Sequence, residues 1–238
     1  MTVAAARSRL AAVDWAQVAT SLDSAGVAVC QGLLRPQECA ALAALYDEES
    51  GFRSRVVMTR HGFGRGEYRY FDYPLPTTVA SLRAALYPHL VLPANRWNQT
   101  AGRAARYPAE HTCFLERCRH AGQSRATPLL LRYEAGDYNC LHQDLYGEHV
   151  FPLQATLLLS APGQDFTGGE FVLVEQRPRR QSRVEVVPLT QGDAAIFAVH
   201  QRPAKGVRGH YQVNMRHGVS RVRSGRRYTL GIIFHDAR

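Results

Sequence analysis

The chain has 238 residues, of which 45% are hydrophobic and 21% charged, so it is long enough to bury one good core. No apolar run reaches the roughly 18 residues that a membrane-spanning helix needs, and Arg7, Arg9 and Asp14 interrupt any signal-like stretch. The net charge of +9 suits an anionic partner, but clustered arginines also occur on ordinary solvated turns. Five scattered cysteines favour reduced thiols. We expect a single-domain, cytoplasmic protein that does not associate with membranes.

The sequence pattern of the first half predicts a helical scaffold with one strand between helices. Apolar residues at helical spacing lead up to Gly26, a typical helix stop, and a second amphipathic segment runs from Pro36 to Gly51. The Gly- and Tyr-rich segment 60–76 is expected to be an irregular loop. Residues 78–120 are expected to be helical, with breaks at the prolines. Residues 1–126 therefore form, by this interpretation, a helical elaboration integrated with the core.

The texture changes at Thr127, where short apolar runs alternate with Gly, Pro and Asp. Examples are FPLQATLLLSAPG, GGEFVLVEQRP and RRYTLGIIFHDA. Many short strands at such spacing indicate an antiparallel sandwich or barrel. We predict a mainly β fold in which residues 127–238 form a jelly-roll-like barrel of about eight strands, with the early helices packed on one sheet.

The stretch LRYEAGDYNCLHQDL places His142 and Asp144 one residue apart. In a strand these positions share one face, so a metal ion can bridge them; a hydrogen-bonded surface pair is the alternative. A non-haem Fe(II) site uses two histidines and one carboxylate, so a third ligand is expected on a later strand. His149 is too near along the chain, and His235 lies at its end. The remaining candidates are His200, His210 and His217.

The HxD at 142–144, followed by the pattern HGVxxVxxGxR from His217, resembles the 2-oxoglutarate and Fe(II)-dependent oxygenases. The similarity is greatest to their prolyl-hydroxylase-like branch and spans Leu131 to Phe234. This resemblance implies a double-stranded β-helix of the cupin type. It also selects His217, so that His142, Asp144 and His217 are the implied Fe(II) ligands.

The same resemblance implies a site for the cosubstrate. In that branch a basic residue ten positions after the distal histidine pairs with the far carboxylate of 2-oxoglutarate, and Arg227 stands there. Arg226 is its neighbour, and adjacent strand residues face opposite ways. Tyr133 and Thr229 are further candidates for cosubstrate contact, with simple barrel packing as the alternative for both.

The implied activity is that of a dioxygenase that uses Fe(II), 2-oxoglutarate and O₂, with ascorbate in support. It would release succinate and CO₂ and hydroxylate an unidentified small-molecule or peptide substrate. Residues 52–76 also resemble a group of bacterial oxygenases whose descriptions suggest demethylation of damaged DNA, so nucleic acid is an alternative substrate. Ile233 departs from the alkylation-repair pattern, which has a second arginine six positions after the first. A non-catalytic binding barrel is the alternative from another class.

Several polar residues and two segments are secondary candidates around this constellation. Asn139 and Gln143 flank the HxD and are candidates for substrate contact, and Glu170 is a candidate acceptor for a ligand histidine. Gly168 and Gly169 are expected to form a turn close to the site. The candidate substrate rim comprises segment 60–76 and the arginine loop near residue 177.

Overall fold

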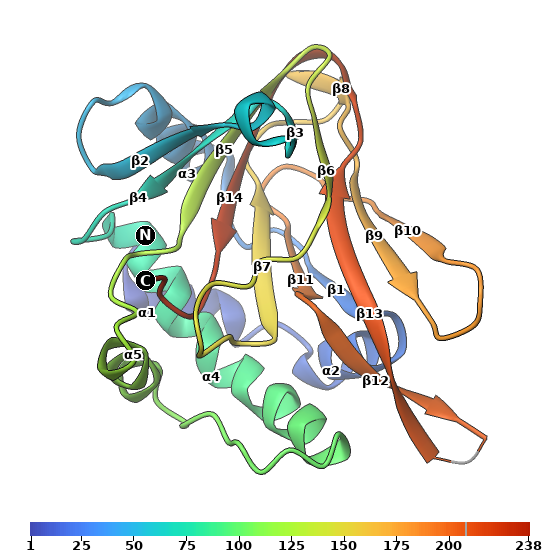
Figure 1. Cartoon of the computed structure of the whole chain (residues 1–238). Helices are drawn as coiled ribbons and strands as arrows, with labels where there is room; N and C mark the ends of the chain where they lie inside the picture. Colours follow the sequence, from blue (N-terminus) through green and yellow to red (C-terminus); the bar gives the residue numbers. More distant parts are fainter. Residues whose placement is uncertain (208) are drawn as a thin grey trace.

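Two antiparallel β-sheets face each other in a computed structural model that describes residues 1–207 and 209–238 (Figure 1). The larger sheet contains, in spatial order, β1 (Val27–Cys30), β11 (Ala194–Ala198), β7 (Leu153–Leu158), β14 (Val222–Ile232), β5 (Leu129–Glu134), β4 (Glu67–Phe71) and β2 (Phe52–Val57), with β8 (Phe166–Gly168) paired to β14. The smaller sheet contains β10 (Arg183–Val187), β9 (Phe171–Gln176), β13 (Gly209–Val219), β6 (Tyr138–His142) and β3 (Gly64–Arg65), with β12 (Gln201–Gly206) paired to β13.

Helices cover the outer face of the larger sheet, as predicted (Figure 1). Strands β7 and β11 are buried at every position because helices pack on one side of them and the smaller sheet on the other. The helices are α1 (Val3–Leu10), α2 (Trp15–Ala25), α3 (Pro36–Ala44), α4 (Thr77–Thr100) and α5 (His111–His120), with the 3₁₀ turns η1 (Leu45–Asp47) and η2 (Met58–His61). No helix among the described residues is both long and apolar enough to cross a membrane. All five cysteines are free thiols.

The predicted mainly β jelly-roll with helices on one sheet is confirmed. Three strands from the first half belong to the larger sheet, since β1 pairs with β11, β4 pairs with β5 and β2 pairs with β4. A fourth, β3, pairs with β6 in the smaller sheet. The division of the chain into an elaboration over 1–126 and a β-helix over 127–238 stays a proposal. The strand pairing shows that the two parts share both sheets.

The expectation of an irregular loop over 60–76 is wrong for residues 64–65 and 67–71, which form β3 and β4. The glycines that suggested a loop permit close approach between strands instead. Gly66 has a φ of +113°, and a Cβ there would lie 2.9 Å from the Tyr133 ring. Strand β4 then pairs with β2 on one side and β5 on the other.

The expected helix breaks at prolines are also absent from α4, which continues through Pro88 and Pro93. Leu82, Leu86 and Leu90 on this helix are fully buried in the core. Tertiary burial therefore outweighs the cost of the missing backbone hydrogen bonds. The chain leaves the helix only after residue 100 and becomes helical again in α5.

A buried ion pair fastens α4 to the chain after β14. Arg83 Nη2 donates to Asp236 Oδ1 at 2.8 Å, and the two side chains are 2% and 0% exposed. Replacing Asp236 by alanine leaves the guanidinium charged and unpaired, so we expect the free energy of unfolding to fall by about 3–5 kcal/mol. Urea denaturation measures this. Glu134→Ala, which breaks the exposed pair with Arg226, is the control and is expected to cost less than about 1 kcal/mol. Equal losses in the two variants would contradict the prediction.

Candidate metal centre

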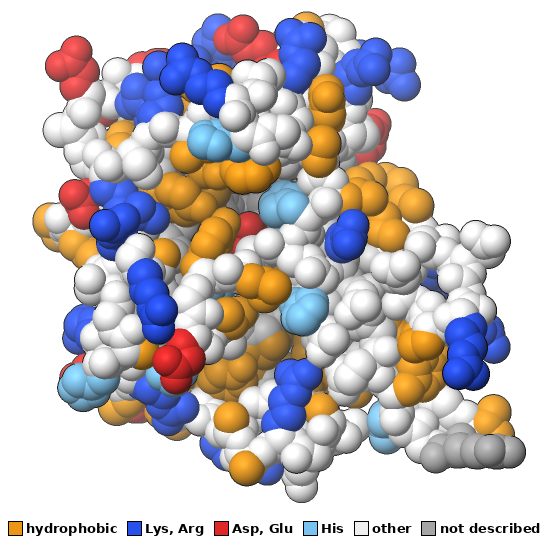
Figure 2. All heavy atoms as spheres, viewed as in Figure 1, with side chains coloured by type: hydrophobic (Ala, Val, Ile, Leu, Met, Phe, Trp, Pro, Cys, Tyr) orange, Lys and Arg blue, Asp and Glu red, His pale blue; other side chains and the backbone are white. Residues whose placement is uncertain are grey.

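A cavity of about 320 Å³ lies between the two sheets, and all six residues that the sequence nominated for the site line it. They come from β5, β6, β13 and β14 and from the loop after β6. Hydrophobic side chains gather around a hollow at the centre of the face shown in Figure 2. The nominated residues are His142, Asp144, His217, Arg227, Tyr133 and Thr229.

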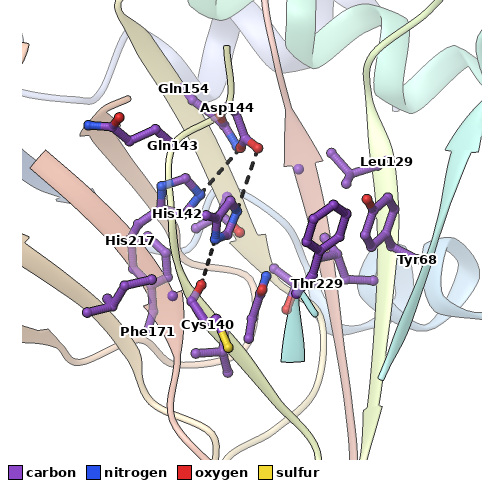
Figure 3. Close-up of a pocket in the computed structure, with 18 of the residues that line it drawn as sticks. Tyr68, Leu129, Cys140, His142, Gln143, Asp144, Gln154, Phe171, His217 and Thr229 are labelled. Carbon is purple, nitrogen blue, oxygen red and sulfur yellow. Dashed lines mark hydrogen bonds and ion pairs between the residues drawn. The ribbon is translucent and has the colours of Figure 1, made fainter. Parts of the chain in front are cut away.

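His142, Asp144 and His217 meet on one wall of the cavity, as Figure 3 shows. His142 ends β6 and lies opposite His217 of β13 in the strand register. Asp144 Oδ1 lies 3.6 Å from His142 Nε2, and Oδ2 lies 3.3 Å from His217 Nε2. Among residues 1–207 and 209–238, this is the one group of three such side chains whose ligand atoms all lie within 4.8 Å of one another.

The pKa shifts of His142 and Asp144 suit metal binding. Burial and the nearby His217 lower the pKa of His142, against the opposing effect of Asp144. His142 Nδ1 lies 2.8 Å from the Cys140 carbonyl oxygen and donates to it, which leaves the Nε2 lone pair free. Burial alone would raise the pKa of Asp144, but hydrogen bonds from His217 and Tyr146 and the electrostatic effect of the two neighbouring imidazoles hold the pKa well below its ordinary value. Asp144 is therefore a carboxylate.

Two imidazole nitrogens and one carboxylate oxygen on one side of a cavity fit Fe(II), because this ion accepts both ligand types and keeps its other positions open. The second ring nitrogen of His217, Nδ1, is buried and has no hydrogen-bond partner among the described residues. The expected acceptor, Glu170, does not serve His217. Glu170 accepts the Ser220 hydroxyl in an exposed hydrogen bond instead.

Arg227 lies in the same cavity as an isolated buried cation. Its side chain is 1% exposed, its Nη1 donates to the Thr229 hydroxyl, and its Nε has no partner among the described residues. No carboxylate lies within 4.0 Å of it in the described part of the chain. Burial lowers the pKa of Arg227 to about 10, so it stays charged at neutral pH. A buried charge without a counterion is costly, so this geometry suits an anion that enters the cavity.

Arg226, the neighbour of Arg227, points the other way. Its Nη2 lies 3.1 Å from Glu134 Oε1, and both side chains are more than half exposed. Strand alternation on β14 therefore separates an inner arginine from an outer one. Gly169 helps the inner residue to fit, since a Cβ at that position would lie 3.0 Å from Arg227 Cδ.

Tyr133 and Thr229 flank Arg227. Tyr133 is opposite Arg227 in the register of β5 and β14, and the guanidinium carbon lies 5.6 Å from its ring centroid. The Tyr133 hydroxyl accepts a hydrogen bond of 3.3 Å from Asn139. Gln143 also lines the cavity, but its amide donates to the Met215 carbonyl at 2.8 Å. Asn139 thus orients the Tyr133 hydroxyl, while the Gln143 amide is hydrogen-bonded to the backbone of β13.

The two segments that the sequence nominated as a substrate rim have different positions. Gly62, Phe63, Tyr68 and Tyr70, from segment 60–76, line the cavity. The arginine loop near residue 177 does not line it, and belongs to a separate shallow hollow formed by Arg179, Arg180 and Gln181. His235 is fully buried beside Tyr146, with ring centroids 6.1 Å apart, but it does not line the cavity, and burial lowers its pKa to about 3.

Three residues that sequence reasoning missed support Asp144. The Tyr146 hydroxyl donates to Asp144 Oδ1 at 2.8 Å, and the Tyr70 hydroxyl donates to Tyr146 at 3.0 Å. Burial and the adjacent Asp144 raise the pKa of Tyr146, so the phenol keeps its proton. Gln123 is fully buried; its amide donates to the carbonyls of Tyr146 and His149, both at 3.1 Å, and it accepts from the His149 N–H.

Gln123 holds the loop after Asp144 in place, and its removal has a measurable cost. Gln123→Leu keeps a similar volume but leaves several buried backbone groups unpaired, so we expect the free energy of unfolding to fall by about 2–4 kcal/mol. Gln164→Leu, at an exposed position, is the control and is expected to change it by less than about 0.5 kcal/mol. Urea unfolding compares the two. A Gln123→Leu protein as stable as the control would show that the loop does not depend on this side chain.

Comparison with known proteins gives one family match. The Oxygenase-NA family, described as an oxygenase catalysing oxidative methylation of damaged DNA, matches residues 66–237. Two uncharacterised proteins from strains of Mycobacterium tuberculosis are each 49% identical to this chain over 167 residues. These residues make up 70% of this chain and 72% of each relative.

Solved structures with the same fold come from several organisms. A prolyl-4-hydroxylase from Pseudomonas putida has a TM-score of 0.55 and 16% identity over 94% of this chain and 99% of its own. A 2OG-Fe(II) oxygenase family oxidoreductase from Burkholderia pseudomallei has a TM-score of 0.54 and 16% identity over 95% of this chain and 93% of its own. A Trichoplax adhaerens prolyl hydroxylase was solved with a hypoxia inducible factor peptide fragment. It has a TM-score of 0.57 and 15% identity over 94% of this chain and 88% of its own. At these identities the similarity is one of fold.

Proposed function

This chain belongs to the Oxygenase-NA family, and from that membership we propose that it hydroxylates a C–H bond of its substrate while converting 2-oxoglutarate into succinate and CO₂. Family and fold confirm the sequence-based expectation of an oxygenase of the 2-oxoglutarate and Fe(II)-dependent superfamily. They also agree with Fe(II), 2-oxoglutarate and O₂ as cofactor and cosubstrates. The finer assignments below are our proposal.

We assign Fe(II) to His142, Asp144 and His217, where it supplies the oxidising chemistry together with O₂ and 2-oxoglutarate. Arg227 binds the far carboxylate of 2-oxoglutarate through its planar guanidinium, and Thr229 adds a hydroxyl next to that position. Tyr133 packs beside Arg227 and limits the entry of water. The observation that supports this most is the buried charge of Arg227, which has no carboxylate within 4.0 Å among the described residues and lies in the same cavity as the three ligands.

The proposed activity is tested by measuring succinate and CO₂ from the purified protein with Fe(II), ascorbate and 2-oxoglutarate under air. We expect equimolar succinate and CO₂, and neither product in a parallel reaction without O₂. Slow turnover is expected without a substrate, so the reaction is run with enzyme near the concentration of 2-oxoglutarate. Succinate formation that does not depend on O₂ or Fe(II) would contradict the proposal.

The mouth of the cavity favours a substrate with an apolar group. Phe63 and Leu141 line the cavity and are 47% and 43% exposed, and Leu145, which follows Asp144 in the chain, is 46% exposed. Exposed apolar side chains grouped beside a cavity typify a binding surface. We therefore propose a small molecule or a peptide that places an apolar side chain here. The expected result is that Phe63→Ser lowers substrate-stimulated succinate formation without changing the affinity for 2-oxoglutarate.

Nucleic acid is the second candidate substrate, supported by the net charge of +9 and by the description of the family. Against it, Ile233 is buried in the core at the position where the alkylation-repair pattern has an arginine. The two candidates differ in salt dependence. Binding to a single-stranded oligonucleotide that weakens steeply with salt would favour nucleic acid, because neutralised phosphates release counterions.

A further inference from the structure

The loop after β6 carries a tyrosine in contact with one oxygen of the metal-binding carboxylate. Tyr146 donates to Asp144 Oδ1 at 2.8 Å, and this oxygen also lies 3.6 Å from His142 Nε2; Asp144 Oδ2 has no such donor and lies nearer to a ligand nitrogen, 3.3 Å from His217 Nε2. The two oxygens of one carboxylate therefore have different partners. The carboxylate is 10% exposed, so solvent contributes little to holding it.

A second tyrosine, from the other sheet, holds the first. Tyr70 lies on β4, is 8% exposed, and donates to the Tyr146 hydroxyl at 3.0 Å. The two rings meet edge to face, with centroids 6.3 Å apart and an interplanar angle of 90°. The guanidinium of Arg53 covers the Tyr70 ring at 4.4 Å. Tyr70 is thus fixed by its neighbours, and a chain of two hydroxyls runs from β4 to Asp144.

We propose that Tyr146 is a positioning residue that makes Asp144 bind the metal ion through Oδ2 alone, and that Tyr70 fixes the direction of the Tyr146 hydroxyl. This inference rests on the proposed function. A carboxylate that binds through both oxygens takes two positions on the ion, whereas one with an oxygen engaged by a hydrogen bond takes a single position. The hydroxyl chain therefore preserves one position for a ligand from the cavity.

The surrounding backbone keeps Tyr146 in this place. The Gln123 side-chain amide donates a hydrogen bond to the Tyr146 carbonyl oxygen, and Gly147 has a φ of +85°. A Cβ at Gly147 would lie 2.7 Å from Gln123 Nε2, so the turn leaves no room for a side chain there. The loop that follows Asp144 is consequently built to aim one hydroxyl at the carboxylate.

Co(II) titration of the metal-free, full-length protein tests this, with visible absorption reporting both affinity and coordination. We expect one Co(II) per chain in the wild type. Tyr146→Phe is expected to bind about 10- to 100-fold more weakly and with a changed absorption spectrum, because the freed Oδ1 alters the coordination of the ion. Tyr70→Phe keeps the Tyr146 hydroxyl and is expected to weaken binding about fivefold.

Tyr138→Phe is the matched control. Tyr138 lies on β6, the strand that ends at His142, but it is not among the residues that line the cavity. It is expected to bind Co(II) like the wild type. Should Tyr146→Phe fail to fold, Tyr70→Phe provides the test.

The possible failures are distinguishable. If Tyr146→Phe, or Tyr70→Phe in its place, has the affinity and spectrum of the Tyr138→Phe control, the positioning role is wrong while the metal site stands. If the wild type binds no Co(II), or binds it equally well after Asp144→Ala, the metal assignment of the proposed function is itself wrong, and this inference is overturned with it.

Discussion

Replacing His142 by alanine is expected to lower succinate formation by more than about 100-fold, since loss of a ligand should exceed the 10- to 100-fold cost of losing a residue that only orients one. In the proposed centre His142 is one of three ligands, and the described residues contain one such group of three. Asp144→Ala is expected to have the same effect. Succinate formation at saturating Fe(II) and 2-oxoglutarate measures both variants.

Stability separates this effect from misfolding. The His142 side chain is 36% exposed and makes one hydrogen bond to the chain's own backbone, so its loss is expected to cost less than about 1.5 kcal/mol of unfolding free energy. His149→Ala is the matched control, because His149 lies on the loop that follows β6 but outside the ligand group. Folded His142→Ala protein with the activity of the control would rule out the assigned metal centre.

The second large effect is expected at Arg227. Arg227→Met keeps much of the side-chain volume but removes the cation, so the concentration of 2-oxoglutarate for half-maximal succinate formation should rise by at least about 100-fold. A buried bidentate ion pair accounts for a loss of this size. Arg227→Lys should be intermediate, because it keeps the charge and loses the planar fork.

Arg226→Met is the control for this experiment. It changes the same residue type at the next position, but its guanidinium is more than half exposed and paired with Glu134. Its dependence on 2-oxoglutarate is expected to match the wild type. The assignment of Arg227 fails if the two methionine variants have the same dependence.

Most of what the sequence could predict about the site came from the alternation of side chains along a strand. It placed His142 and Asp144 on one side of a strand end, and the structure brings both to the cavity wall. It also separated Arg226 from Arg227, and the structure has one pointing out and the other in. These inferences depend only on a period of two, which needs no knowledge of distant partners.

Features that depend on distant partners could not be predicted. Tyr70 and Tyr146 are 76 positions apart, and Gln123 reaches Tyr146 across 23 positions. Nothing in the local pattern of LYGEHVF marks a tyrosine as a partner of the carboxylate. The strand β4 was missed for a similar reason, since Gly64 and Gly66 just before it looked like loop residues, whereas Gly64 lies close to β6 and Gly66 close to β5.

For Glu170 the sequence suggested a contact that the structure does not have. A glutamate near the start of β9 looked suitable as an acceptor for a ligand histidine, yet its carboxylate engages Ser220 on the surface. The period of a strand gives the face on which a side chain lies, but not which residue it meets across the sheet. His217 Nδ1 is therefore left without the partner that the sequence suggested.

Anaerobic binding of 2-oxoglutarate to the Fe(II)-loaded protein tests the central claim most directly, because it needs neither the unknown substrate nor turnover. Calorimetric titration is expected to give one 2-oxoglutarate per chain, with binding that disappears without Fe(II) and in Arg227→Met but persists in Arg226→Met. Wild-type protein that takes up Fe(II) yet binds no 2-oxoglutarate would contradict the account.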